Sequence, residues 1–258
     1  MRLMKRILSA AAVLALSASL LVGCSSGTAS SVPVSASSAA ESTVSSVEET
    51  ASSAVDENEA AAAQLLNDLT GSYQELWPVI LADEYKQTWL DDCTALVGED
   101  NAEAAFEKLS SMVTGDVYGE DAVKAYANGG GAYFCGFTNS LAILTFDGET
   151  STISGTDKDG NVLFSHIYHY IGMEPVHGLY EFESDDADSG EFTYFFLAPD
   201  TSAETYHIEF RYGSDAEALS QYDTGEYAYW LASGISTDCD QTMIDNCIEL
   251  FCTENLAG

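Results

Sequence analysis

The chain has 258 residues, and its 42 acidic and eight basic side chains give a formal net charge of −34 at pH 7. Nucleic acid is a poor partner for such a chain, because phosphate binding needs lysine and arginine in number. A strongly negative field favours cations, although an acidic surface also serves solubility. The composition therefore argues against a nucleic-acid-binding protein and leaves a cation as a reasonable ligand.

The start of the chain has the layout of a secretory signal. A positively charged segment at 1–6 precedes an apolar run at 7–21, and Leu-Val-Gly-Cys at 21–24 closes the run. The run is shorter than the ~20 apolar residues that a membrane span needs. The segment resembles a bacterial lipoprotein signal, which implies cleavage before Cys24 and a lipid on that cysteine; a signal with a chance cysteine is the alternative. We expect an exported protein held to the cell membrane by its lipid alone, facing outside the cytoplasm.

Residues 24–56 consist almost entirely of Ser, Ala, Thr, Val and Glu, without an aromatic side chain. Such a segment cannot bury enough apolar surface to offset the entropy of ordering it. We therefore divide the chain into a lipoprotein signal peptide at 1–23, a tether with the lipidated cysteine at 24–56, and one domain at 57–258. Five cysteines remain in this domain, so at least one is unpaired, and no C-x-x-C motif is present.

Helices are predicted at the start of the domain. An Ala- and Leu-rich helix is expected at 58–68. Ser72 then resembles the N-cap of a helix that continues to about Val97, because Glu75 follows three residues later as in a capping box. Pro78 marks a kink or a boundary in it. Further short helices are expected at 102–112 and 120–127.

The pattern changes to a period of two after the three glycines at 129–131. Seven strand-like runs follow, at about 132–138, 141–147, 150–156, 161–171, 176–183, 191–198 and 204–212. The Asp-Gly pairs at 147–148 and 159–160 favour hairpin turns. The segment 157–161 has some features of a calcium loop, but its spacing departs from the EF-hand pattern and no Glu closes it, so we interpret it as a turn.

A short helix at 215–221 and a final helix at 240–253 complete the predicted elements. The final helix presents Ile244, Cys247, Ile248 and Phe251 to a core. Helices first, then successive antiparallel strands and a closing helix predict an α+β domain. Seven or more such strands close most readily into a barrel.

The segment 205–213 alternates strictly and reads as a half-buried strand. Tyr206, Ile208, Phe210 and Tyr212 are predicted to face the core, and Thr205, His207, Glu209 and Arg211 lie on the other face. Residues two apart on a strand point the same way, roughly 6.5–7 Å apart, so one cation could reach both His207 and Glu209. The alternative is an ordinary solvated strand face.

Four segments together resemble the ZinT (YodA-like) family of exported zinc-binding proteins. They are Gly71–Pro78, Thr138–Asp147, Gly178–Glu183 and Leu197–Ile208. The likeness extends over about 69–251. It implies a calycin/lipocalin-like antiparallel β-barrel preceded by helices and closed by a C-terminal helix. It also implies zinc as the ligand.

The expected family site is incomplete in this chain. The family binds zinc with a histidine from an S-D-H tripeptide and with both histidines of H-x-H. Thr205 replaces the first histidine of the pair, His207 is the second, and the strand at 192–197 has none. The resemblance implies His207 as the inherited ligand, and we expect Glu209 and His169 as its partners. Other residues remain open as ligands: His166, His177, Asp200 and Glu204.

The expected function is divalent-metal binding at a degenerate site, with zinc as the first choice, in support of uptake by an ABC-type importer. The alternative is a binding module of the same fold that has lost its metal and holds a small molecule or an envelope protein. No G-x-S-x-G, H-E-x-x-H, P-loop or Rossmann pattern occurs. We therefore do not expect an enzyme.

Overall fold

The computed structural model describes residues 57–257. The predicted signal, the lipidation site Cys24 and the tether lie outside the described residues. Among the helices of the described part, none has the length and apolar character needed to cross a bilayer.

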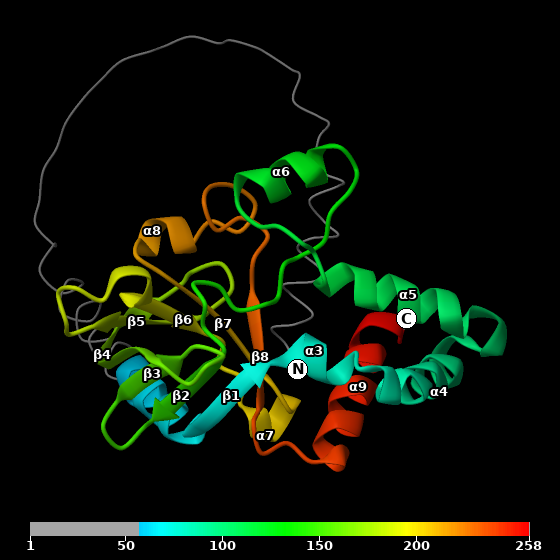
Figure 1. Ribbon diagram of the computed structural model, residues 1–258, viewed down its shortest axis with the longest axis horizontal. Coiled ribbons are helices and arrows are strands. Elements are labelled where there is room, and N and C mark those ends of the chain that lie inside the picture. The colour runs from blue at the N-terminus through cyan, green and yellow to red at the C-terminus, as the bar shows by residue number, and fades with distance from the viewer. Residues whose placement is uncertain (1–56, 258) are drawn as a thin grey trace, which may run out of the picture.

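Eight strands form a closed antiparallel barrel in which each strand pairs with the next and the last pairs with the first (Figure 1). The strands are β1 (Gly71–Glu75), β2 (Ile143–Asp147), β3 (Thr152–Thr156), β4 (Val162–Met173), β5 (Tyr180–Ser184), β6 (Tyr194–Leu197), β7 (Ile208–Gly213) and β8 (Ala232–Ser236). This order is that of an up-and-down barrel of the calycin type. The α+β barrel expected from the sequence is confirmed.

Helices flank the barrel at both ends of the described chain. An unlabelled helix at 57–68 precedes β1. The others are α3 (Leu76–Ile80), α4 (Lys86–Val97), α5 (Glu99–Val113), α6 (Glu120–Ala127), α7 (Ser202–Thr205), α8 (Ala216–Leu219) and α9 (Gln241–Leu256). Figure 1 shows α4, α5 and α9 grouped beside the barrel, and α9 contacts both of its neighbours.

Aromatic side chains fill the inside of the barrel. Phe182, Phe195, Phe210 and Tyr212 alternate with outward residues on β5, β6 and β7, and each is at most 1% exposed. The ring centroids of Phe195 and Tyr212 lie 5.3 Å apart. The inward face predicted for Ile208, Phe210 and Tyr212 is thus confirmed.

A second apolar core lies between the helices and the outside of the barrel. Trp89 on α4 is fully buried and its ring lies 5.9 Å from that of Phe251 on α9. Its indole Nε1 donates to the Ile80 carbonyl at 2.7 Å. Asp240 caps α9 by accepting from Met243 N, and the four core residues predicted for this helix are all buried.

The predicted helix at Ser72 is wrong. Gly71–Glu75 is strand β1, which closes the barrel between β2 and β8, and the helix begins only at Leu76. The Ser72 hydroxyl lies 2.9 Å from that of Thr145 on β2 and caps no helix. Pro78 is the third residue of α3, where its missing N–H costs little.

The strands differ from the prediction in three further places. The run at 132–138 forms no named strand and contributes isolated bridges at Phe134. Strand β8 was not predicted, because Ala-Ser-Gly-Ile-Ser carries little β-propensity. Strand β7 starts at Ile208, since Thr205 ends α7 and Tyr206 has a φ of +65°. Tyr206 therefore packs against the helical core and not inside the barrel.

Candidate functional site

The outward face of β7 is buried under other parts of the chain. His207, which directly precedes the strand, is 3% exposed and Arg211 is 0% exposed. Cys247 of α9 lies over the histidine, with its Sγ 3.9 Å from His207 Nδ1. The Arg211 guanidinium donates to the carbonyls of Leu219 and Tyr227. The alternative of a solvated strand face does not hold for this strand.

A tight turn orients His207. The Thr205 hydroxyl donates to the His207 carbonyl at 3.0 Å, and Tyr206 between them adopts the left-handed conformation. This conformation is strained for a bulky side chain, and strain of this kind clusters at functional sites. The turn brings the His207 ring back onto the backbone of Thr205.

The ring contacts determine which nitrogen of His207 can bind a ligand. Nδ1 lies 2.7 Å from the Thr205 carbonyl oxygen, which can only accept a hydrogen bond, so Nδ1 carries the proton. Nε2 then presents its lone pair, and it lies 4.0 Å from Glu209 Oε1. Metal-binding histidines commonly donate one ring N–H to a carbonyl and use the lone pair of the other ring nitrogen for the metal, as Nδ1 and Nε2 are disposed here.

Burial keeps this pair largely uncharged at neutral pH. It raises the pKa of the Glu209 carboxyl to about 8, and the charges of Asp200 and Glu254 act in the same direction. Burial also lowers the pKa of His207, while the Thr205 carbonyl and Asp200 partly oppose the shift. A divalent cation would displace the proton from the Glu209 carboxyl and leave the imidazole neutral, because these are the forms of the two groups that bind a metal.

The pair fits part of a zinc site. Zinc binds imidazole and carboxylate at about 2.0–2.2 Å, so two such donors on one tetrahedral ion lie about 3.4 Å apart. The 4.0 Å between His207 Nε2 and Glu209 Oε1 is slightly wider. Across 57–257, no group of three or more His, Cys, Asp or Glu is arranged to hold a metal. The pair supplies two donors, which is fewer than the three or four protein ligands of a usual zinc site.

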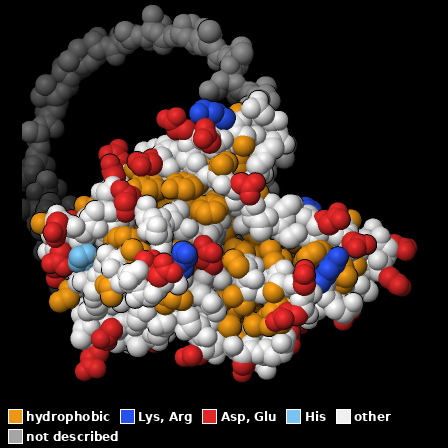
Figure 2. Space-filling model, viewed as in Figure 1, with side chains coloured by type: hydrophobic (Ala, Val, Ile, Leu, Met, Phe, Trp, Pro, Cys, Tyr) orange, Lys and Arg blue, Asp and Glu red, His pale blue; other side chains and the backbone are white. Residues whose placement is uncertain are grey.

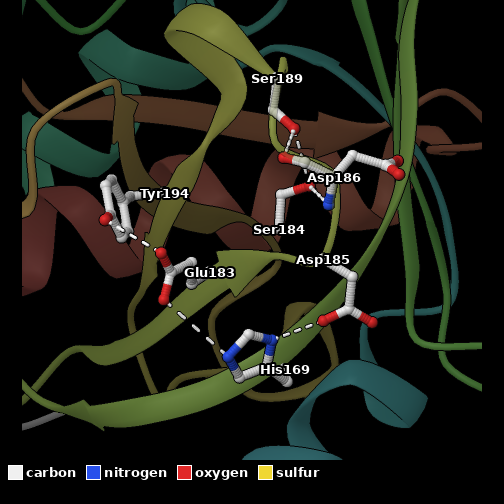
Figure 3. Close-up of polar contacts among 7 residues, drawn as sticks. All are labelled: His169, Glu183, Ser184, Asp185, Asp186, Ser189 and Tyr194. Atoms are coloured by element: carbon white, nitrogen blue, oxygen red, sulfur yellow. Dashed lines mark hydrogen bonds and ion pairs between the residues drawn. The ribbon is translucent and has the colours of Figure 1, made fainter.

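His169 lies in another part of the barrel. It stands on β4 opposite Glu183 of β5, and β6 separates β5 from β7. Its Nδ1 is 2.7 Å from Asp185 Oδ1 and its Nε2 is 3.9 Å from Glu183 Oε2, as Figure 3 shows. The Tyr194 hydroxyl donates to the other oxygen of Glu183 at 3.1 Å. The structure thus brings together His207 and Glu209 and places His169 in a separate, half-exposed cluster.

The two other histidines also have acidic neighbours of their own. His166 Nδ1 lies 2.6 Å from Asp186 Oδ2. His177 is buried with its Nδ1 3.3 Å from Glu174 Oε2. Neither the Asp186 pair nor the Glu174 pair includes a residue of the His207 site.

Three contacts at this face were not anticipated from the sequence. Cys247 was interpreted as core filler, and it is buried but also touches His207. Glu254 follows it by seven residues on α9, a helical spacing that puts both on one face, and its charge acts on Glu209. The sequence places Arg211 on the polar face of the strand. Its spacing does not indicate that its guanidinium donates to the backbone carbonyls of Leu219 and Tyr227.

No family model and no curated protein matches this sequence. Among solved structures, the chain is similar to the zinc-bound ZinT-like domain of AdcA from Streptococcus pneumoniae, with 15% identity and a TM-score of 0.45 over 71% of this chain and 89% of that one. It is also similar to zinc-bound AdcA from the same organism, with 14% identity and a TM-score of 0.42 over 70% of this chain and 34% of that one. The chain spans about a third of AdcA. Both scores lie below 0.5, and neither structure assigns a ligand to this chain.

Proposed function

We propose that this chain is an exported, lipid-anchored protein that binds a divalent metal ion, zinc in the first place, at His207 and Glu209. It would be a binding protein and not an enzyme, and it would deliver the metal to an ABC-type importer. One observation carries the metal proposal. The imidazole of His207 is held through Nδ1 and presents Nε2 to a buried carboxylate 4.0 Å away.

The surroundings of the pair favour a cation. Asp200 and Glu254 add negative charge at Glu209. Figure 2 shows Asp and Glu spread over the visible face, where Lys and Arg are few. A low-dielectric, acidic site strengthens the attraction of a divalent ion. Two protein donors and water give a weaker site than three histidines, which suits an ion that must be handed on.

The test is zinc titration calorimetry on residues 57–258, with His207→Ala and Glu209→Gln. We expect one zinc site in the micromolar range that both substitutions weaken at least tenfold. His169→Ala is the matched control, because it removes another histidine with acidic neighbours and leaves the pair intact. Affinity unchanged in His207→Ala would refute the site.

Proton release gives an independent signature of the same site. A Glu209 carboxyl with a pKa of about 8 is about 90% protonated at pH 7, so zinc should displace close to one proton. Calorimetry in two buffers of different ionisation enthalpy measures that number. Glu209→Gln should abolish the release, and equal release in both proteins would exclude Glu209 as a ligand.

A second candidate function is a protein-binding module, which the outside of β4 favours. Leu163, Ile167 and Ile171 recur at every fourth position along this strand, with Ser165 and His169 between them, and the three apolar side chains are 37–51% exposed. The paired strand β5 carries Glu181 and Glu183 on its outer face. An apolar row beside carboxylates matches a cationic partner with alternating apolar residues.

The β4 candidate is tested with a fluorescent peptide of alternating Lys and Leu. Ile167→Thr combined with Ile171→Thr keeps the β-propensity and should weaken binding severalfold. The same peptide with Glu in place of Lys should not bind. If the double variant binds the cationic peptide as well as the unsubstituted protein does, the β4 face is not the contact.

A further inference from the structure

Two cysteines from distant parts of the chain meet in the helical core. Cys93 lies on α4 and Cys252 on α9, and their Sγ atoms are 3.9 Å apart. Both side chains are fully buried. This is the one sulfur–sulfur hydrogen-bonding contact among the five cysteines of the described residues 57–257.

The surroundings hold the two thiols against each other. Helices α4 and α9 pack against each other, and Figure 1 shows them as neighbours beside the barrel. The ring of Trp89, one turn before Cys93, lies 5.9 Å from that of Phe251, next to Cys252. A disulfide needs its sulfurs at about 2.05 Å, so the thiols must approach by roughly a further 1.9 Å. Side-chain rotation of two contacting thiols on packed helices can supply that approach.

The remaining cysteines of the described residues lack such a neighbour. Cys135 donates to the Tyr133 carbonyl at 3.9 Å, and Cys247 contacts His207. Cys239 is the one of the five that is only half-buried. Among the five, Cys93 and Cys252 are therefore the pair whose sulfurs are in contact, and three thiols remain outside it, which accounts for the odd number of cysteines after Cys24.

We propose that Cys93 and Cys252 form a disulfide that fixes α9 to α4. Two S–H bonds break and one S–S bond forms, and a low-molecular-weight disulfide or an oxidase of the thiol–disulfide class takes up the two electrons and two protons as two thiols. Outside the cytoplasm such a bond persists. The crosslink goes beyond the proposed metal function; it rests on the proposed export of the chain and does not require the metal.

The position of the crosslink has two consequences. It closes a loop of about 160 residues, and disulfides that close long loops constrain the unfolded chain most. It also anchors the helix whose Cys247 covers His207. Burial raises the pKa of both thiols, so few thiolates exist in the folded protein. The bond therefore forms while the helices dock and resists reductants once they have docked.

The decisive experiment counts thiols and maps the bond. The chain from residue 25 onward, which has five cysteines, is unfolded, refolded with reduced and oxidised glutathione, denatured again and labelled with a maleimide. We expect three labels per chain by mass after oxidation and five after reduction. Cleavage after glutamate should release 85–99 joined to 250–254, each of which contains one cysteine.

Variants separate the pair from the other thiols. Cys93→Ala and Cys252→Ala should each give four labels after the oxidising treatment, because the partner stays free. Cys247→Ala, the matched control on the same helix, should still lose two thiols and keep the joined peptides. The oxidised protein should melt about 10 °C above the reduced one. Five labels after oxidation, or joined peptides that lack Cys93 or Cys252, would overturn the proposal.

Discussion

Replacing Glu209 by Gln should make the protein more stable at alkaline pH and remove a large part of its pH dependence. The carboxyl has a pKa of about 8 in the folded protein against an ordinary value of 4.5. A raised pKa means that the folded state holds the proton more tightly than the unfolded chain does. The stability from this proton is fully present below pH 4.5 and is lost as the pH rises through 8.

The size of the effect follows from the shift. Between pH 5 and pH 8 the metal-free protein should lose about 3.5 kcal/mol of unfolding free energy through this one group. That figure is an upper limit, because the side chain of Glu209 is still 11% exposed and water reaches part of it. The amide of Gln has nearly the same shape and cannot ionise, so the variant keeps its stability across this range.

Urea unfolding followed by tryptophan fluorescence measures this difference, at pH 5, 6, 7 and 8 in constant salt with a chelator. Subtracting the two curves removes the contribution of every other titrating group. Relative to the unsubstituted protein, the unfolding free energy of the variant should rise steadily with pH between pH 5 and pH 8. The rise should reach about 2 kcal/mol or more at pH 8, which is about half the upper limit. Asp157→Asn is the control of opposite sign, since hydrogen bonds from Asn161 lower the pKa of this exposed turn carboxylate. If the unfolding free energies of Glu209→Gln and the unsubstituted protein change with pH in parallel, the carboxyl of Glu209 is not buried in its protonated form.

Three further substitutions test buried contacts in different parts of the fold. Arg211→Met removes the donors of a fully buried guanidinium and should cost about 3 kcal/mol or more of unfolding free energy; a loss below about 1 kcal/mol would contradict its role in holding the loop. Gly148→Ala would place a Cβ 2.4 Å from the Asn67 Cα, so the backbone of one of the two segments would have to shift. We expect a melting temperature lower by several degrees, which corresponds to a loss of about 1–3 kcal/mol of unfolding free energy. Trp89→Phe removes the hydrogen bond to the Ile80 carbonyl, so the urea midpoint should fall and the unfolding free energy should decrease by about 1–2 kcal/mol. An unchanged midpoint would show that this hydrogen bond does not contribute to stability.

The sequence predicts those parts of the fold whose signals are local. The alternation of Ile208, Phe210 and Tyr212 and the helical stripe with Cys247 and Phe251 each depend on a period, and a core lies where the period indicates. For the short strand β1, the local signal predicts the wrong structure. Ser72 and the residues after it fit a capping box, but pairing with strands far along the chain outweighs this preference.

The candidate site was only partly predictable, for a physical reason. A period of two separates the two faces of a strand, but it does not tell whether water or another element covers the polar face. His207 and Glu209 share a face as expected, and the helix that covers them comes some 40 residues later. The position of His169 depends on the strand order around the barrel, in which two strands, β5 and β6, separate its strand β4 from β7.

Stability and metal binding oppose each other at Glu209. Without a metal, the buried carboxyl keeps its proton near neutral pH, and the protein loses stability wherever that proton leaves. A divalent ion takes the place of the proton, so it should restore above pH 8 the stability that the metal-free protein loses there. The Gln variant avoids the loss and has no carboxylate to offer the metal. Glu209→Gln should therefore raise stability and weaken zinc binding together, which is the trade-off expected of an ionisable group held in a buried binding site.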